Sequence, residues 1–168
     1  TPFVLTVYPS IPAKSTSELI ALAKAKPGDL TFATSGVGGL THMAMELILS
    51  MTGTKMVGVH YKSTGAAMAD LLAGQAPIIV GSLLPIVPHV ATGKLRALAV
   101  TTEKPWYALP NVPTVGATLP GYAVELWFGA MAPRNTPQPV VDALNGAINK
   151  ILTEPERSEE HTSELQSP

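Results

Sequence analysis

The residues best placed for chemistry lie in one glycine-rich segment, Thr34-Ser35-Gly36-Val37-Gly38-Gly39. Glycines let the backbone turn sharply and leave nothing to block a ligand that approaches main-chain N–H groups. A helix that begins after such a turn adds unpaired N–H groups and a partial positive charge, which together suit a carboxylate or a phosphate. The segment therefore predicts an anion-binding turn.

The glycine spacing differs from that of the common nucleotide sites. Gly36-x-Gly38 lacks the third glycine of a dinucleotide-binding fingerprint, because Thr41 stands at that position. No Gly-Lys-Ser/Thr sequence follows, so the segment is not a nucleotide P-loop. By pattern alone, a tight strand-to-helix connection without a ligand remains an equal alternative.

Nucleophilic catalysis by Ser35 with His42 is a second interpretation of this segment. The nucleophile elbow has the pattern Gly-x-Ser-x-Gly, whereas Thr34 precedes Ser35 and Gly36 follows it. No Asp or Glu is placed by the sequence to orient His42. A cation is disfavoured in the first turn of a helix, so we predict a neutral hydrogen-bonding role for His42. A small-molecule enzyme of doubly wound α/β type that uses Ser35 and His42 stays the alternative function.

The turn requires a strand before it and a helix after it, and the hydropathy pattern predicts both. Residues 30–33 are a short apolar run, and Leu40, Met43 and Leu47 then recur at helical spacing. Further strands are predicted at 3–8, 56–61, 78–80, 95–101 and 124–131. Further helices are predicted at 15–26, 66–73, 84–90 and 137–152. This alternation implies an α/β fold with a largely parallel sheet and helices on both faces, where ligands bind beyond the carboxyl ends of the strands.

Composition and charge exclude several classes of function. The formal net charge is −1 and no basic face is evident, so we expect no nucleic-acid partner. The chain has no Cys, and no spacing of His, Asp or Glu is typical of a metal site. We therefore predict neither a metal nor a cofactor.

The two ends of the chain look truncated. The first residue is not Met, and the chain enters a predicted strand at once, without a signal peptide. Residues 157–168 are polar, lack an apolar face, and can be back-translated into a widely used sequencing adapter. We expect residues 157–168 to be an artefactual, disordered tail.

Several long motifs occur in order along the chain. They include Pro9-Ser10-x-Pro12, Ser35-Gly36-x-Gly38 with His42, His60-Tyr61-Lys62, Asp70-Leu71-Leu72-x-Gly74-Gln75, Gly93-Lys94-Leu95-Arg96-Ala97-Leu98, Leu109-Pro110-x-Val112-Pro113-Thr114 and Trp127-Phe128-Gly129-x-x-Ala132-Pro133. Through these motifs residues 3–156 resemble the solute receptors of tripartite tricarboxylate transporters, the Bug family of periplasmic binding proteins.

The resemblance implies a periplasmic-binding-protein-like fold of two α/β domains with mostly parallel sheets flanked by helices and a ligand between them. Residues 1–8 would be a crossover strand, 9–123 the second ligand-binding domain, and 124–156 a crossover strand with the C-terminal part of an incomplete first domain. The implied function is an extracytoplasmic, non-catalytic receptor in the bacterial periplasm. It would capture a small organic carboxylate for the membrane subunits of the transporter, and it would be a monomer at full length.

The resemblance also implies the site residues. In the family, backbone amides and ordered waters from two such loops hold the carboxylate, and the domains close by a hinge. The corresponding residues are Ser35, Gly36, Val37, Gly38, Gly39, Thr41, His42, Gly81 and Ser82. Relatives often carry an acidic residue after the strand at 78–80, whereas this chain has Gly81-Ser82. An amine-free carboxylate is therefore favoured, and citrate-like acids, dicarboxylates, aromatic acids and pyridine carboxylates all remain open.

Overall fold

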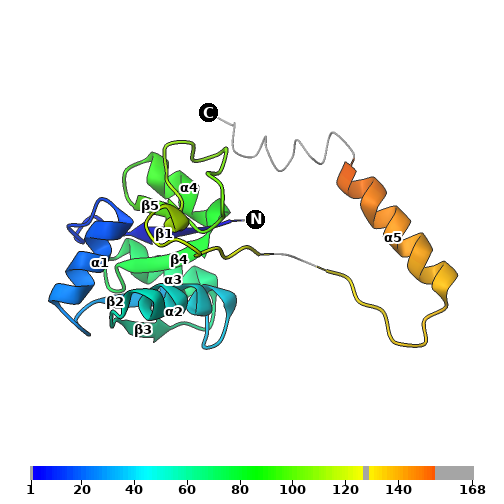
Figure 1. The fold of residues 1–168 in the computed structure, drawn as a ribbon, viewed down its shortest axis with the longest axis horizontal. Coiled ribbons are helices and arrows are strands. Elements are labelled where there is room, and N and C mark those ends of the chain that lie inside the picture. The colour runs from blue at the N-terminus through cyan, green and yellow to red at the C-terminus, as the bar shows by residue number, and fades with distance from the viewer. Residues whose placement is uncertain (1, 127–128, 154–168) are drawn as a thin grey trace. The chain divides into compact units, whose positions relative to one another are not determined.

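The computed structural model describes residues 2–126 and 129–153. The chain divides into two compact units, Thr1–Trp127 and Phe128–Pro168. The first unit contains a five-stranded sheet and the helices α1 to α4, and the second contains α5 (Figure 1).

The observed elements agree with the predicted ones to within two residues at their ends, with one exception described below. The strands are β1 (Phe3–Val7), β2 (Thr31–Thr34), β3 (Val57–His60), β4 (Ile78–Ser82) and β5 (Arg96–Val100). The helices are α1 (Thr16–Ala25), α2 (Leu40–Thr52), α3 (Thr64–Leu72), α4 (Leu83–Ala91) and α5 (Gln138–Thr153), with a short 3₁₀ turn at Val115–Ala117.

The sheet has the strand order β3-β2-β4-β1-β5. β2 is parallel to β3 and β4, whereas β1 is antiparallel to both β4 and β5. Four strands therefore run in one direction, as predicted, and β1 alone runs in the opposite one. The carboxyl ends of β2, β3, β4 and β5 consequently share one edge of the sheet with the start of β1.

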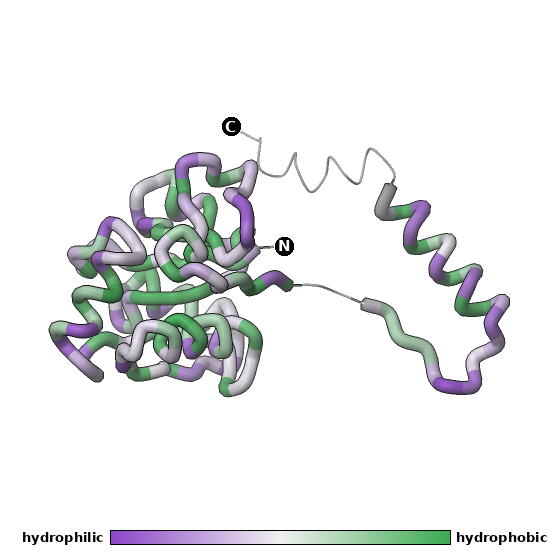
Figure 2. The backbone as a smooth tube through the Cα atoms, viewed as in Figure 1, coloured by the Kyte–Doolittle hydropathy of each residue, from purple (hydrophilic) through white to green (hydrophobic). Residues whose placement is uncertain are grey.

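Helices cover both faces of the sheet because the side chains of each strand alternate between the faces. Along β4, Ile78 and Val80 pack in one cluster with residues of α1 and α2, and Ile79 packs in another with residues of α3 and α4. In Figure 2 a hydrophobic segment runs through the middle of the sheet, in keeping with the sequence Ile78-Ile79-Val80 of β4. The result is a three-layer α/β/α arrangement with the core on both sides of the sheet.

The predicted strand at 124–131 is wrong for the residues that the structure describes. Glu125 forms only an isolated antiparallel bridge with Pro2, and Val124 N–H donates to the carbonyl of Thr101 at 2.9 Å. Both edges of β1 are already paired with β4 and β5, and Pro2 has no N–H with which to extend a ladder. Residues 127 and 128 lie outside the described residues.

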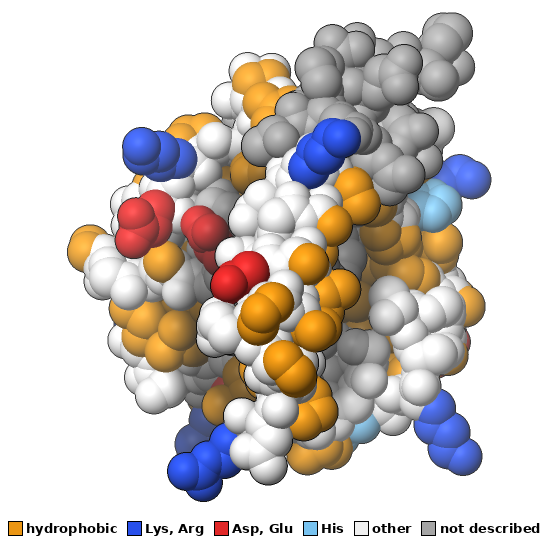
Figure 3. All heavy atoms as spheres, turned by 90° about the vertical axis from the view of Figure 1, so that its right-hand side faces the viewer, with side chains coloured by type: hydrophobic (Ala, Val, Ile, Leu, Met, Phe, Trp, Pro, Cys, Tyr) orange, Lys and Arg blue, Asp and Glu red, His pale blue; other side chains and the backbone are white. Residues whose placement is uncertain are grey.

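The helix of the second unit is α5. Four apolar side chains of α5 are exposed, each at least 41% accessible: Val140, Leu144, Ile148 and Ile151. Hydrophobic side chains lie exposed on the face drawn in Figure 3. None of the helices in residues 2–126 and 129–153 combines the length and the hydropathy that crossing a membrane requires.

Candidate functional site

The glycine turn connects the end of β2 to the start of α2 at the carboxyl edge of the sheet. β2 lies between β3 and β4 in the sheet. After β2 the chain passes through α2 to β3 on one side of β2, and after β3 it passes through α3 to β4 on the other side. In open α/β sheets ligands bind at such a switch point. Gly81 and Ser82 end β4, the neighbouring strand, at the same edge. The fold thus brings the two predicted groups of site residues to adjacent strand ends.

At two positions of the turn glycine is required because of the backbone conformation, and not because a side chain would lack space. Gly36 has φ 139° and Gly38 has φ 75°, in the region that L side chains rarely adopt. A Cβ at either position would meet no heavy atom within 4 Å. Ser35, Val37, Gly38 and Gly39 are exposed, while Gly36, Thr41 and His42 are half-buried. The turn is therefore open to a ligand.

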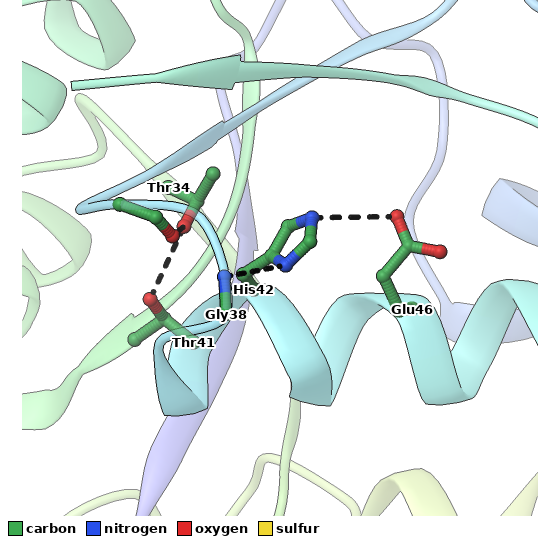
Figure 4. A network of polar contacts seen from close by, with 6 residues as sticks. Thr34, Gly38, Thr41, His42 and Glu46 are labelled. Carbon is green, nitrogen blue, oxygen red and sulfur yellow. Dashed lines mark hydrogen bonds and ion pairs between the residues drawn. The ribbon is translucent and has the colours of Figure 1, made fainter.

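Hydroxyl groups converge at the base of the turn (Figure 4). The buried Thr34 donates from Oγ1 to the carbonyl of Gly36 at 3.0 Å. Its Oγ1 lies 3.5 Å from Oγ1 of Thr41, which is also 3.4 Å from Oγ of Ser35. Since the proton of Thr34 is used by Gly36, Thr41 is the donor in its contact with Thr34. In its contact with Thr41 the donor is then Ser35, whose exposed hydroxyl must turn away from Thr41 to donate to a ligand.

One ring nitrogen of His42 accepts a hydrogen bond, and the other lies near a carboxylate. Its Nδ1 accepts from the backbone N–H of Gly38 at 3.2 Å, and its Nε2 lies 3.6 Å from Oε1 of Glu46. Because Nδ1 accepts a hydrogen bond, the ring proton is on Nε2 and faces Glu46. His42 thus makes a hydrogen bond, as predicted, and the partner is the turn itself.

The ring of His42 is also held by two aromatic neighbours. Phe32 of β2 stacks on it with ring centroids 6.2 Å apart. His60 of β3 meets it edge-on at 5.0 Å. The side chain of His42 is only 16% exposed, so its orientation is set by packing.

The pairing of Ser35 with His42 that catalysis requires is not present among the described residues. Both nitrogens of His42 face Gly38 and Glu46, and the hydroxyl of Ser35 contacts Thr41. No base is therefore placed to remove the proton of Ser35. Within the described residues, no three His, Cys, Asp or Glu side chains are grouped as a metal ion would need.

Gly81 is buried, with Ile86 of α4 and Ile79 of β4 as its nearest side chains. A Cβ there would lie 2.9 Å from Cδ1 of Ile86 and 3.4 Å from Cδ1 of Ile79. α4 begins directly after β4, with Ser82 as its N-cap and no side-chain capping bond. The end of β4 can therefore offer a ligand only backbone at Gly81 and a hydroxyl at Ser82.

Sequence reasoning missed three contributors to this site: Thr34, Glu46 and His60. Glu46 could have been found, since residues four apart lie on the same face of a helix. His60 entered the sequence analysis only as part of a family motif, and it is exposed. It reaches His42 because Thr34 pairs with His60 in the β2–β3 register, and no local pattern contains this contact.

Three hollows in the surface contain none of the turn residues 34–42, although one of them is lined by Glu46 together with Leu49 and Lys55. The glycine turn lies instead on an open edge. A ligand at this turn would need a second surface opposite it to be enclosed.

Known proteins resemble this chain in sequence and in fold. A sequence model described as the tripartite tricarboxylate transporter family receptor matches residues 1–165. Protein BugT of Bordetella pertussis is 34% identical over 152 residues, which are 90% of this chain and 47% of BugT. The family match extends into the segment 157–168 that we expect to be extraneous.

Solved structures of known proteins also resemble this chain. The structure of R. palustris Rpa4515 with adipate has a TM-score of 0.86 and 34% identity, over 95% of this chain and 54% of that one. MatC from Rhodopseudomonas palustris with bound malate has a TM-score of 0.82 and 29% identity, over 94% of this chain and 54% of that one. This chain spans about half the length of these relatives. The predicted α/β class is confirmed, and the chain belongs to the tripartite tricarboxylate transporter receptor family.

Proposed function

We propose that this chain is part of a periplasmic receptor that captures a small organic carboxylate and delivers it to the membrane subunits of a tripartite tricarboxylate transporter. The observation that carries the proposal is the exposed glycine turn at the start of α2, at the switch point of the sheet. The relatives solved with adipate and malate support it. The receptor performs no chemistry on its ligand, and Ser35 acts as a hydrogen-bond donor.

The proposed receptor has two domains, of which this chain supplies one and a part of the other. Residues 1–8 enter the second domain, 9–123 form it, and 124–156 cross back into the first domain. A second loop of the first domain then faces the glycine turn, and the full-length protein is a monomer that closes over its ligand. The open edge on which the turn lies supports this arrangement, because one domain alone would leave the ligand in solvent.

The ligand is an amine-free carboxylate. Within the described residues, no hydrogen bond uses the N–H groups of Leu40 and Thr41 at the start of α2, and such groups attract anions. Gly39 is the N-cap and has no side chain that would compete for them. An ammonium group would need an acidic partner, and Gly81 supplies none.

Titration calorimetry of the full-length protein tests the proposal with adipate, malate, citrate, benzoate and aspartate. We expect at least one amine-free acid to bind and aspartate to bind much more weakly. Ser35→Ala should weaken binding by about tenfold, the scale of one hydrogen bond to a charged group, and leave the ligand chemically unchanged. Turnover of any ligand that is lost in Ser35→Ala would instead make the protein an enzyme.

A further inference from the structure

The start of α2 is organised differently from the starts of α1 and α3. Ser15 and Ser63 cap α1 and α3 with their own hydroxyl oxygens, which accept from Glu18 N–H and Ala66 N–H. At α2 the N-cap is Gly39, which has no side chain. The stabilising contact comes from inside the helix: His42, three residues after the cap, reaches back and accepts from Gly38 N–H.

This contact resembles a capping box displaced by one residue. In a capping box the third helical residue returns to the N–H of the cap, whereas His42 returns to the residue before the cap. Gly38 is left-handed, with φ 75°, so the bond closes the turn just where the backbone reverses. The N–H of Gly38 is thereby committed to imidazole and is not free for a ligand.

The groups around His42 hold its ring in the orientation that the contact with Gly38 needs. Phe32 stacks on the ring, His60 meets its edge, and Glu46 lies 3.6 Å from Nε2. Together they hold Nδ1 toward Gly38 and Nε2 away from the turn. The ring therefore has no nitrogen directed at the position where an anion would meet the N–H groups of Leu40 and Thr41.

We propose that His42 is a positioning residue of the carboxylate site: its Nδ1 fixes Gly38 and so aims the first turn of α2 at the ligand, without touching the ligand. This inference rests on the proposed function, because it assumes that the turn binds a carboxylate. It assigns to Gly38 a structural role and leaves ligand contact to the N–H groups that follow Gly39.

Two variants of the full-length protein separate this role from a general packing role. In the His42→Asn variant the side-chain oxygen occupies the place of Nδ1. In the His42→Gln variant the side-chain oxygen occupies the place of Nε2. We expect hydrogen exchange of the Gly38 amide, measured by NMR, to stay as slow in His42→Asn as in the wild type and to be about tenfold faster in His42→Gln. The ¹⁵N shifts of His42 should show the Nε2–H tautomer in the wild type.

Binding of the acid panel is measured on the same three proteins. We expect His42→Asn to bind like the wild type and His42→Gln about tenfold more weakly, at equal thermal stability. Equal affinity of both variants, or a Gly38 amide that exchanges equally fast in all three, overturns the positioning role. If the wild type binds no acid while the exchange pattern holds, the receptor function fails and the Gly38–His42 contact is only structural.

Discussion

The hydroxyl of Tyr122 donates a hydrogen bond to the carbonyl oxygen of Ala44 at 3.0 Å. Tyr122 is 2% exposed and packs in the same cluster as Ala44 and Met45 of α2. Burial raises the pKa of Tyr122 well above its usual range. This contact joins the loop-rich segment after β5 to the inner side of α2, the helix that carries the candidate site.

Tyr122→Phe should lower the free energy of unfolding by about 0.5–1.5 kcal/mol, because it removes one buried hydrogen bond and keeps the ring. Urea denaturation checks this value. Tyr8→Phe is the matched control, since within the described residues the hydroxyl of the half-buried Tyr8 makes no hydrogen bond. An equal loss in both variants would mean that the Tyr122–Ala44 bond contributes nothing specific.

Stability should decrease at alkaline pH through Tyr61. Its hydroxyl donates to Oδ2 of Asp70 at 2.7 Å. Burial, followed by the hydrogen bond and the charge of Asp70, raises the pKa of Tyr61 to about 12. An unfolded tyrosine has a pKa of about 10. The folded state therefore holds the phenolic proton more tightly, and this stabilisation is complete below pH about 10 and is lost as the pH rises through about 12.

Tyr61→Phe removes this titration. The difference in unfolding free energy between the wild type and Tyr61→Phe should shrink as the pH is raised from about 9 to about 12, as measured by urea denaturation at each pH. Tyr122 titrates in both proteins, so its contribution cancels from the difference. Curves that stay parallel over the whole interval would contradict the prediction.

Alanine substitutions at two glycines should change stability in opposite directions. A Cβ at Gly38 or at Gly65 would meet no atom within 4 Å, so neither substitution causes a clash. Gly38→Ala should lose about 1–2 kcal/mol, because φ is 75° there. Gly65→Ala, in the first turn of α3, should gain about 0.5 kcal/mol from a better helix propensity. Thermal and urea unfolding test both, and a Gly38→Ala variant as stable as the wild type would argue against the left-handed turn.

Deletion of residues 157–168 should change neither solubility nor the thermal transition. The segment is polar and has no apolar face to bury, although the family match reaches residue 165. Scanning calorimetry of the chain with and without the segment decides the matter. A clearly lower transition temperature in the shortened chain would show that these residues belong to the fold.

Local pattern was sufficient to predict the helices and most strands. Apolar periodicity located α2, and the glycines of 36–39 marked the turn before it, because both properties depend on residues close together in sequence. The prediction of a strand at 124–131 was wrong because strand pairing depends on residues distant in sequence. The hydropathy of this segment is that of a strand, but a strand also needs a continuous partner. Glu125 meets only Pro2, next to β1, and both edges of β1 are occupied by β4 and β5.

The position of the candidate site followed from the sequence, but its contacts were decided by tertiary structure. The anion turn could be predicted because glycines and a helix start are local features. That Gly38 N–H is used by His42 depends on the rotamer of the imidazole, which Phe32 and His60 set from neighbouring strands. Side-chain rotamers in a packed site depend on residues distant in sequence. The sequence alone therefore indicated where an anion would bind, and only the packed sheet determined which donors remain free for it.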